Sequence, residues 1–123
     1  MIAMIVMESS NNSTKFRKAK YNDIKEATYM LLNLVPPGKV TTYKELAILL
    51  STSPRVIGRA LKENNKPIII PCHRVVGSNG HLKGYSMGGL EVKKRLLLIE
   101  GVEVKNYTVP KKYILKLTDI LMS

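Results

Sequence analysis

The sequence predicts a mostly helical fold with one short strand, organised around a helix-turn-helix of the winged-helix kind. Three patterns support this prediction. Apolar residues recur at helical spacing from Asp23 to Leu34, and capping residues at Thr42 and Ser53 each mark the start of a further helix. Three consecutive isoleucines at residues 68–70 are typical of a short buried strand. A chain of 123 residues, 45% of them hydrophobic, can bury a core of its own, so we expect one domain.

The first predicted helix runs from Asp23 to Leu34. Asn22 can cap its beginning, and the sequence Pro36-Pro37-Gly38 ends it. Its apolar positions are Ile24, Ala27, Leu31 and Leu34. This helix is expected to contribute packing and not function.

The residues before this helix are predicted to form a short N-terminal arm, residues 1–20, ahead of a domain that spans residues 21–123. Residues 1–7 are apolar and predict either a strand or a disordered start. Residues 8–14 are rich in Ser and Asn, which is typical of a flexible linker.

Two short helices are predicted next. Thr42 and Glu45 form a capping box, which starts a helix at Tyr43 that runs to about Leu50. Ser53 is a good N-cap, and the second helix spans Pro54 to Glu63. The apolar positions of the second helix are Val56, Ile57, Ala60 and Leu61. Two short helices joined by about three residues form a helix-turn-helix.

The single cysteine of the chain follows the predicted strand. Pro71 should end the strand because it lacks an N–H group, and Cys72, His73 and Arg74 come directly after it. Cationic neighbours favour an ionised thiol, which is a nucleophile. The alternative is a cysteine that only fills the core. Two polar neighbours argue against that alternative, because buried polar groups need partners.

The remaining elements are predicted from turn and helix signals. Residues 77–80 form a turn, and residues 84–89 form a glycine-rich loop that lacks the Gly-Lys-Ser/Thr ending of a phosphate loop. A helix from Leu90 to Glu100 follows, closed by Gly101. The last predicted helix spans Pro110 to Met122 and is assigned only packing. The inward positions of these two helices are Leu90, Leu96, Leu97, Ile99, Ile114, Leu117, Ile120 and Leu121.

Charge and composition narrow the function classes. Twenty Lys and Arg against nine Asp and Glu give a net charge of +11, which favours a polyanion partner, above all nucleic acid. One cysteine allows no intramolecular disulfide, which fits a reducing compartment, and no Cys-based zinc cluster. No apolar run reaches the roughly 18 residues of a membrane helix, and residues 1–7 lack signal-peptide features. We expect an intracellular protein, in the cytoplasm or nucleoid, with no membrane partner.

The motif Pro71-Cys72-His73-Arg74-Val75 resembles the active-site signature of the methylated-DNA–protein-cysteine methyltransferases, also called O6-alkylguanine-DNA alkyltransferases. The resemblance runs from about Ile24 to Val102, which corresponds to the C-terminal catalytic and DNA-binding domain of that family. A separate N-terminal domain usually precedes it, and here about twenty residues stand in that place. The resemblance implies irreversible, single-turnover transfer of an alkyl group from O6-alkylguanine in double-stranded DNA to Cys72. O4-alkylthymine is a second candidate substrate, and a monomer without cofactor or metal is expected.

The resemblance also implies the catalytic roles. Cys72 is the nucleophile, and His73 is the candidate base, since an ordinary histidine pKa near 6.5 suits proton uptake at neutral pH. Glu100, 28 residues after the cysteine, matches the family glutamate that orients the histidine. Tyr43 matches the tyrosine that donates a hydrogen bond to the guanine and helps to rotate its nucleotide. Lys93 matches a lysine that supports the guanine oxygen.

Other matched positions would bind substrate. Asn64 matches an asparagine that links the DNA helix to the active site. Tyr85 and Ser86 match the loop wall of the guanine pocket. Without the resemblance, Tyr85 would be an ordinary loop aromatic residue.

The predicted DNA contacts lie on the helix pair, where the resemblance implies docking in the minor groove. Arg55 matches an arginine finger that fills the gap left by the extruded base. Tyr43 contributes from the first helix, and Gly58 supplies a small residue on the second. The chain departs from the family pattern in two ways. It is two residues shorter between Tyr43 and Arg55, and Arg59 stands where a small residue is common.

Three other functions are alternatives to alkyl transfer. A non-enzymatic sensor of alkylguanine would resemble the alkyltransferase-like proteins, but those replace the cysteine that this chain keeps. A transcription factor would use the same helix pair and leaves Cys72, His73 and Glu100 unexplained. A cysteine hydrolase would need an acyl substrate, which the net charge of +11 does not favour.

Overall fold

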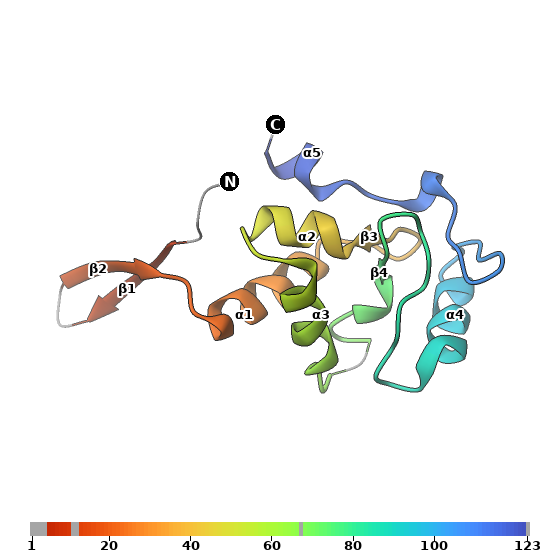
Figure 1. Cartoon of the computed structure of the whole chain (residues 1–123), viewed down its shortest axis with the longest axis horizontal. Coiled ribbons are helices and arrows are strands. Elements are labelled where there is room, and N and C mark those ends of the chain that lie inside the picture. The colour runs from red at the N-terminus through yellow and green to blue at the C-terminus, as the bar shows by residue number, and fades with distance from the viewer. Residues whose placement is uncertain (1–4, 11–12, 67, 123) are drawn as a thin grey trace.

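A computed structural model describes residues 5–10, 13–66 and 68–122 (Figure 1). The structure is mostly helical with two small two-stranded sheets, so the predicted fold class is confirmed. Its elements, in chain order, are β1 Ile5–Ser10, β2 Ser13–Lys18, α1 Tyr21–Leu32, β3 Thr41–Thr42, α2 Tyr43–Leu49, α3 Pro54–Lys62, the 3₁₀ turn η1 Cys72–Arg74, β4 Val75–Val76, α4 Gly89–Ile99, the 3₁₀ turn η2 Lys111–Tyr113 and α5 Leu117–Leu121.

The helix pair α2–α3 begins at the two predicted caps. The Thr42 hydroxyl accepts a hydrogen bond from the backbone N–H of Glu45 at 3.1 Å, and the Ser53 hydroxyl accepts one from Val56 at 3.3 Å. Both helices end within one residue of the prediction. The predicted helix-turn-helix is therefore confirmed, because short-range capping signals alone specify where its helices start.

The predicted strand over residues 68–70 is wrong. Ile68 and Ile69 lie in an exposed turn, with 62% and 75% of their surfaces accessible. This segment closes on itself, since the N–H of Ile70 donates to the Lys66 carbonyl at 3.0 Å and the N–H of Cys72 donates to the Ile70 carbonyl at 2.8 Å. A strand needs a neighbouring backbone for its hydrogen bonds, and an apolar run alone does not supply one.

The strand in this part of the chain comes after the cysteine instead. The β4 residues Val75 and Val76 pair in parallel with Thr41 and Thr42 of β3. All four residues are buried. Because successive strand residues face opposite sides, Val75 joins the core formed with α1, α2 and α3, whereas Val76 joins a second core around α4. Cys72 therefore begins the 3₁₀ turn that leads directly into a fully buried strand.

The C-terminal segment also differs from its prediction. Instead of one helix over residues 110–122, η2 is followed by an extended stretch and the short α5. The extended stretch pairs with Val40, whose N–H donates to the Tyr113 carbonyl at 2.9 Å and whose carbonyl accepts from Leu115 at 2.6 Å. This tertiary pairing outweighs the helical apolar pattern. Leu117 is buried, while the predicted inward residues Ile120 and Leu121 are exposed.

Three smaller expectations about the helices are wrong. Helix α1 starts at Tyr21, so Asn22 lies inside it, and the Asp23 carboxylate accepts from the N–H of Lys20 at 2.7 Å. Leu34 follows the helix and is exposed. In α4 the predicted inward residues Leu90 and Ile99 are exposed, and the buried positions are Lys93 and Leu97.

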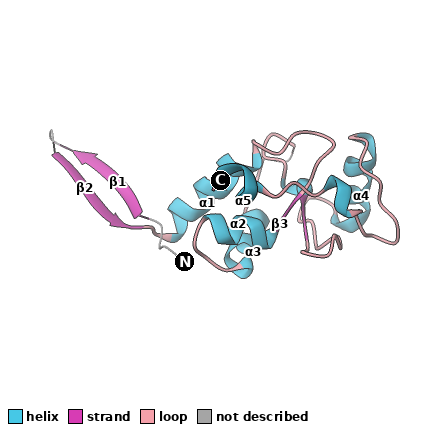
Figure 2. Cartoon of the chain, turned by 90° about the horizontal axis from the view of Figure 1, so that it is seen from above, coloured by secondary structure: helices cyan, strands magenta, loops and turns pink. Residues whose placement is uncertain are grey.

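The N-terminal residues form an antiparallel hairpin, β1–β2, which stands at one end of the molecule beside α1 (Figure 2). Ile5 pairs with Lys18, and Ser10 pairs with Ser13. The flexible linker expected over residues 8–14 is wrong for residues 8–10 and 13–14, which are strand; residues 11–12 and 1–4 lie outside the described part of the chain. Among the described residues, no helix is long and apolar enough to cross a membrane.

Candidate active site

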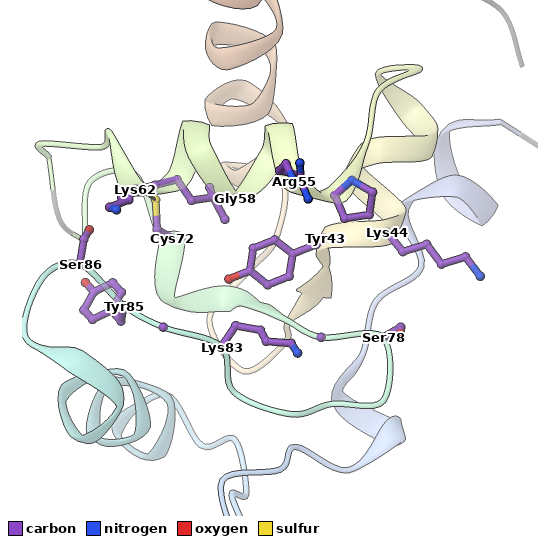
Figure 3. A pocket seen from close by; sticks show the side chains of 14 residues that line it. Tyr43, Lys44, Arg55, Gly58, Lys62, Cys72, Ser78, Lys83, Tyr85 and Ser86 are labelled. Carbon is purple, nitrogen blue, oxygen red and sulfur yellow. Dashed lines mark hydrogen bonds between the residues drawn. The ribbon is translucent and has the colours of Figure 1, made fainter.

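A cavity of about 710 Å³ opens between the helix pair α2–α3 and the segment 77–86 (Figure 3). Its wall combines cationic, aromatic and small side chains with the single cysteine. The lining residues are Tyr43, Lys44, Pro54, Arg55, Gly58, Leu61, Lys62, Cys72, Gly77, Ser78, Lys83, Gly84, Tyr85 and Ser86. The structure thus brings together six of the predicted site residues, namely Tyr43, Arg55, Gly58, Cys72, Tyr85 and Ser86.

Cys72 is 6% exposed and is held by the end of α3. The Asn64 amide donates a hydrogen bond to the thiol sulfur at 2.8 Å and another to the Ile70 carbonyl at 3.0 Å. The thiol itself lies 3.9 Å from the Leu61 carbonyl, which it can reach as a donor. Asn64 therefore connects the second helix of the pair, the turn after it and the sulfur.

Burial raises the pKa of the Cys72 thiol to about 11, and the Asn64 hydrogen bond and the positive charge of Lys93 lower it by less. The expectation of an easily ionised thiol is therefore wrong for this resting structure. The sequence showed cationic neighbours but not the loss of solvent around the sulfur, and desolvation disfavours the charged form. At neutral pH, Cys72 is protonated until something takes its proton.

Behind Cys72 lies a compact charged group. His73 is fully buried, and its Nε2 atom lies 3.1 Å from Oε2 of Glu100. The contact lies off the direction of a well-aligned hydrogen bond, and within the described residues neither ring nitrogen has such a bond. Burial lowers the pKa of His73, and the Glu100 carboxylate only partly offsets this effect. The imidazole is therefore neutral at pH 7 and free to accept a proton.

Arg74 holds the carboxylate of this group. Its Nε and Nη2 atoms donate to Oε1 and Oε2 of Glu100 at 3.0 and 2.6 Å, and its Nη1 atom donates to the Val35 carbonyl at 2.8 Å. Burial alone would raise the pKa of Glu100, but the hydrogen bonds from Arg74 and the close approach of His73 hold it below its usual value. The sequence analysis assigned Arg74 no such role. A planar guanidinium next to the histidine was the available signal, because it matches a carboxylate in two-pronged geometry.

Tyr43 and Lys93 lie close to one another and within electrostatic reach of Cys72. The Tyr43 hydroxyl points across the cavity toward Cys72 and Tyr85 (Figure 3). Burial raises the pKa of Tyr43 to about 12, so its phenol keeps its proton and can donate it in a hydrogen bond. Lys93 is 1% exposed, and its ammonium group donates to the Lys83 carbonyl at 3.1 Å and lies 6.0 Å from the centre of the Tyr43 ring. Burial lowers the pKa of Lys93 to about 8.

Two arginines of α3 point to different sides. Arg55, in the first turn, is exposed and lines the cavity together with Gly58, next to which an added methyl group would meet only open space. Arg59 lies outside the lining, because its guanidinium stacks 3.8 Å above the ring of Tyr21 and its Nε donates to Glu63 at 3.3 Å. The predicted DNA contacts on this helix therefore occupy two faces.

Three lysines of the lining were not singled out from the sequence. Lys44 lies on α2, Lys62 ends α3, and Lys83 lies in the loop opposite them. The high net charge indicated such residues in number but not in position. Among the described residues, no three His, Cys, Asp or Glu side chains cluster as they would to hold a metal ion.

Comparisons with known proteins agree with this geometry. The family model described as "6-O-methylguanine DNA methyltransferase, DNA binding domain" matches residues 23–102. The curated methylated-DNA–protein-cysteine methyltransferase of Sulfolobus acidocaldarius is 43% identical over 90 residues, which are 73% of this chain and 52% of that protein. The chain thus spans about half the length of the curated relatives it matches.

Solved structures give the same relation. The O6-methylguanine-DNA methyltransferase of Pyrococcus kodakaraensis superposes with a TM-score of 0.59 at 49% identity and covers 63% of this chain and 46% of that one. The structure of S. pombe Atl1 in complex with damaged DNA containing O6-carboxymethylguanine has a TM-score of 0.72 at 26% identity, over 80% of this chain and 99% of that chain.

Proposed function

We propose that this chain, which belongs to the family of the 6-O-methylguanine DNA methyltransferase DNA-binding domain, repairs O6-alkylguanine in double-stranded DNA by taking the alkyl group onto Cys72. One observation carries the proposal. The single thiol of the chain lies in the wall of a cavity of about 710 Å³ beneath a cationic helix pair. A cavity of this size is typical of sites for small molecules and accommodates a purine base.

The target base must leave the duplex to reach the sulfur. Enzymes that act on a base extrude its nucleotide, which costs a few kcal/mol of stacking and pairing. Arg55 lies at the rim of the cavity and can stack in the space that the base leaves. Gly58, one turn further along α3, allows the sugar–phosphate backbone to approach the helix closely. Arg59 would contact phosphates from the outer face of the same helix.

The transfer breaks the bond between the alkyl carbon and O6 of guanine and forms a bond between that carbon and the Cys72 sulfur. In the resting structure the thiol lies against the Leu61 carbonyl and makes no hydrogen bond to His73, so it must turn before its proton passes to that neutral imidazole. The Glu100 carboxylate then stabilises the positive charge of the ring. Arg74 is a positioning residue, because it holds that carboxylate with both oxygens engaged. The guanine leaves as an anion and takes up one proton, so that no proton is gained or lost in total.

Tyr43 and Lys93 serve the guanine side of the reaction. The protonated phenol of Tyr43 donates a hydrogen bond to the base, and the buried ammonium group of Lys93 stabilises negative charge on the sulfur or on the leaving guanine. Tyr85 and Ser86 form the opposite wall. The product is a thioether that no group of this site can cleave, so each molecule reacts once and needs no cofactor. The protein would act as a monomer on DNA inside the cell, in the cytoplasm or nucleoid.

The proposal is tested by weighing the intact protein after incubation with a duplex that carries one O6-methylguanine. We expect a gain of one methylene group on Cys72, with no gain in the Cys72→Ala variant and none with an undamaged duplex. A wild-type protein that binds the modified duplex without gaining mass would overturn the proposal.

A second function is supported by one observation. The S. pombe Atl1 structure is matched over 99% of its length, whereas the curated methyltransferases are matched over about half of theirs. A sensor that binds alkylguanine without reacting would use the same helix pair and cavity. The presence of Cys72 beside His73 and Glu100 favours transfer, and the mass measurement separates the two functions.

A further inference from the structure

The C-terminal segment, which follows the last residue matched by the family model, helps to form a second cavity of about 430 Å³. This groove is lined by Thr42, Lys44, Glu45, Ser78, Lys111, Ile114, Lys116, Thr118 and Asp119. Lys44 and Ser78 also line the cavity that holds Cys72, so the two hollows adjoin each other. In Figure 3 the Lys44 side chain points away from Cys72, on the side where the C-terminal segment passes.

The segment is fixed in place and is not a loose tail. Its extended stretch pairs with Val40, and Leu117 is buried in the core. The Glu45 carboxylate accepts hydrogen bonds from the backbone N–H and the hydroxyl of Thr118, at 3.1 and 2.8 Å. These contacts fasten the segment to α2 and therefore to the helix pair. Lys111 and Lys116 are exposed and flank this attachment.

The charges of the groove suit an anionic chain. Three lysines line it against two carboxylates, and the Glu45 carboxylate is already engaged by Thr118. Lysines and hydroxyl groups are the usual contacts to phosphate oxygens, which fix the position of a protein on a duplex without reading its sequence. A strand that enters the first cavity with one extruded nucleotide must continue past its rim, and Lys44 and Ser78 are the part of that rim shared with the groove.

We propose that this groove binds the sugar–phosphate backbone beside the extruded nucleotide, through Lys44 on α2 and through Lys111 and Lys116 of the C-terminal segment. This proposal rests on the proposed function, since it takes the partner to be a duplex with one base in the Cys72 cavity. It gives the C-terminal segment a binding role in addition to packing. It also extends the DNA surface beyond the helix pair to residues that the family model does not match.

The test compares two double variants with equal loss of charge. K111Q/K116Q removes both lysines of the groove, and K105Q/K112Q removes two exposed lysines of the same segment that lie outside it, one of which pairs with Glu103 at 3.4 Å. Binding to a duplex that carries one O6-methylguanine is measured by fluorescence anisotropy over a range of salt concentrations, with Cys72→Ala in every protein so that the base stays unreacted. For K111Q/K116Q the slope of log K against log salt should become shallower by about 2, because each phosphate contact contributes about 0.9. K105Q/K112Q should keep the slope of the protein with all four lysines.

A second measurement separates this proposal from the proposed function. The rate at which free O6-benzylguanine alkylates Cys72 should be equal in both variants and in the wild type, because this small substrate has no phosphate. Equal slopes for the two variants would overturn the groove proposal while alkyl transfer stands. If the slope is shallower in K111Q/K116Q but the wild type is never alkylated, the groove still binds DNA and the repair function is refuted. A wild-type protein that does not bind the duplex would overturn both.

Discussion

The two sides of Cys72 are built in opposite ways. In front of the sulfur, Tyr43, Arg55 and Tyr85 project into an open cavity from three different parts of the chain (Figure 3). Behind it, His73 and Arg74 lie within 3.1 Å of one carboxylate, that of Glu100, and these side chains are largely buried. The difference teaches that the front leaves room for a ligand, whereas the imidazole of His73 is already held beside its carboxylate in the absence of one. The two sides should therefore fail differently when they are mutated.

The largest effect is expected behind the sulfur. Glu100→Gln removes the charge that stabilises protonated His73, so the rate of alkyl transfer should fall about 10²-fold or more, the range of general-base contributions. The loss should be equal for the methylated duplex and for free O6-benzylguanine, because the proton must be removed in both reactions. Single-turnover kinetics followed by intact mass measures it. Glu103→Gln, on the exposed side of the same region, is the matched control; a loss seen only with the duplex would contradict the role of Glu100.

A smaller effect, confined to one substrate, is expected in front. Arg55→Ala should lower the rate with the duplex by about tenfold or more, since extrusion of the base costs a few kcal/mol, and should leave the rate with free O6-benzylguanine unchanged. Arg59→Ala removes the same charge from the other face of α3, where that arginine stacks on Tyr21, and should slow the duplex reaction less. Equal losses with both substrates in Arg55→Ala would refute the finger role.

The smallest effect is a shift in titration. Burial lowers the pKa of His73 below the ordinary value of about 6.5. Between the two values the unfolded chain binds more protons than the native chain, so the free energy of unfolding should fall as the pH falls through about 6.5. NMR titration of the imidazole resonances measures the shift, with the exposed His81 as the second histidine of the chain. Glu100→Gln should lower the pKa of His73 further, because the carboxylate favours the protonated ring. A wild-type His73 that titrates above 6.5 would show that the Glu100 carboxylate outweighs burial, and would refute the prediction.

Local signals were enough to predict the helix pair. Thr42 and Ser53 cap the helices that follow them in sequence, and no distant partner is needed. The strand could not be predicted in the same way. Residues 68–70 and Val75–Val76 are equally apolar and β-branched. Val75 and Val76 form a strand paired with Thr41 and Thr42, whereas Ile68 and Ile69 lie in a turn and Ile70 makes one isolated bridge. The single helix over residues 110–122 was predicted wrongly for the same reason, because that segment pairs with Val40, which is distant in sequence.

The part of the site that could be predicted is the set of residues named by the family resemblance. The resemblance named Tyr43, Arg55, Cys72 and Tyr85, and these residues line one cavity. The resemblance did not predict the hydrogen-bonded ion pair between Arg74 and Glu100. These residues are 26 positions apart, and only the fold brings them together. The ionisation of the thiol was predicted wrongly, because the charges beside Cys72 are visible in the sequence and its desolvation is not.

A thiol that stays protonated in the resting protein is also protected against oxidation. Peroxides and stray electrophiles attack thiolates far faster than thiols, and the pKa of about 11 leaves very little thiolate at neutral pH. Under the proposed function each molecule reacts once, so premature oxidation would inactivate it, and this chain has no second cysteine to replace the first. The desolvation that keeps the thiol protonated would therefore also protect the nucleophile until a substrate binds.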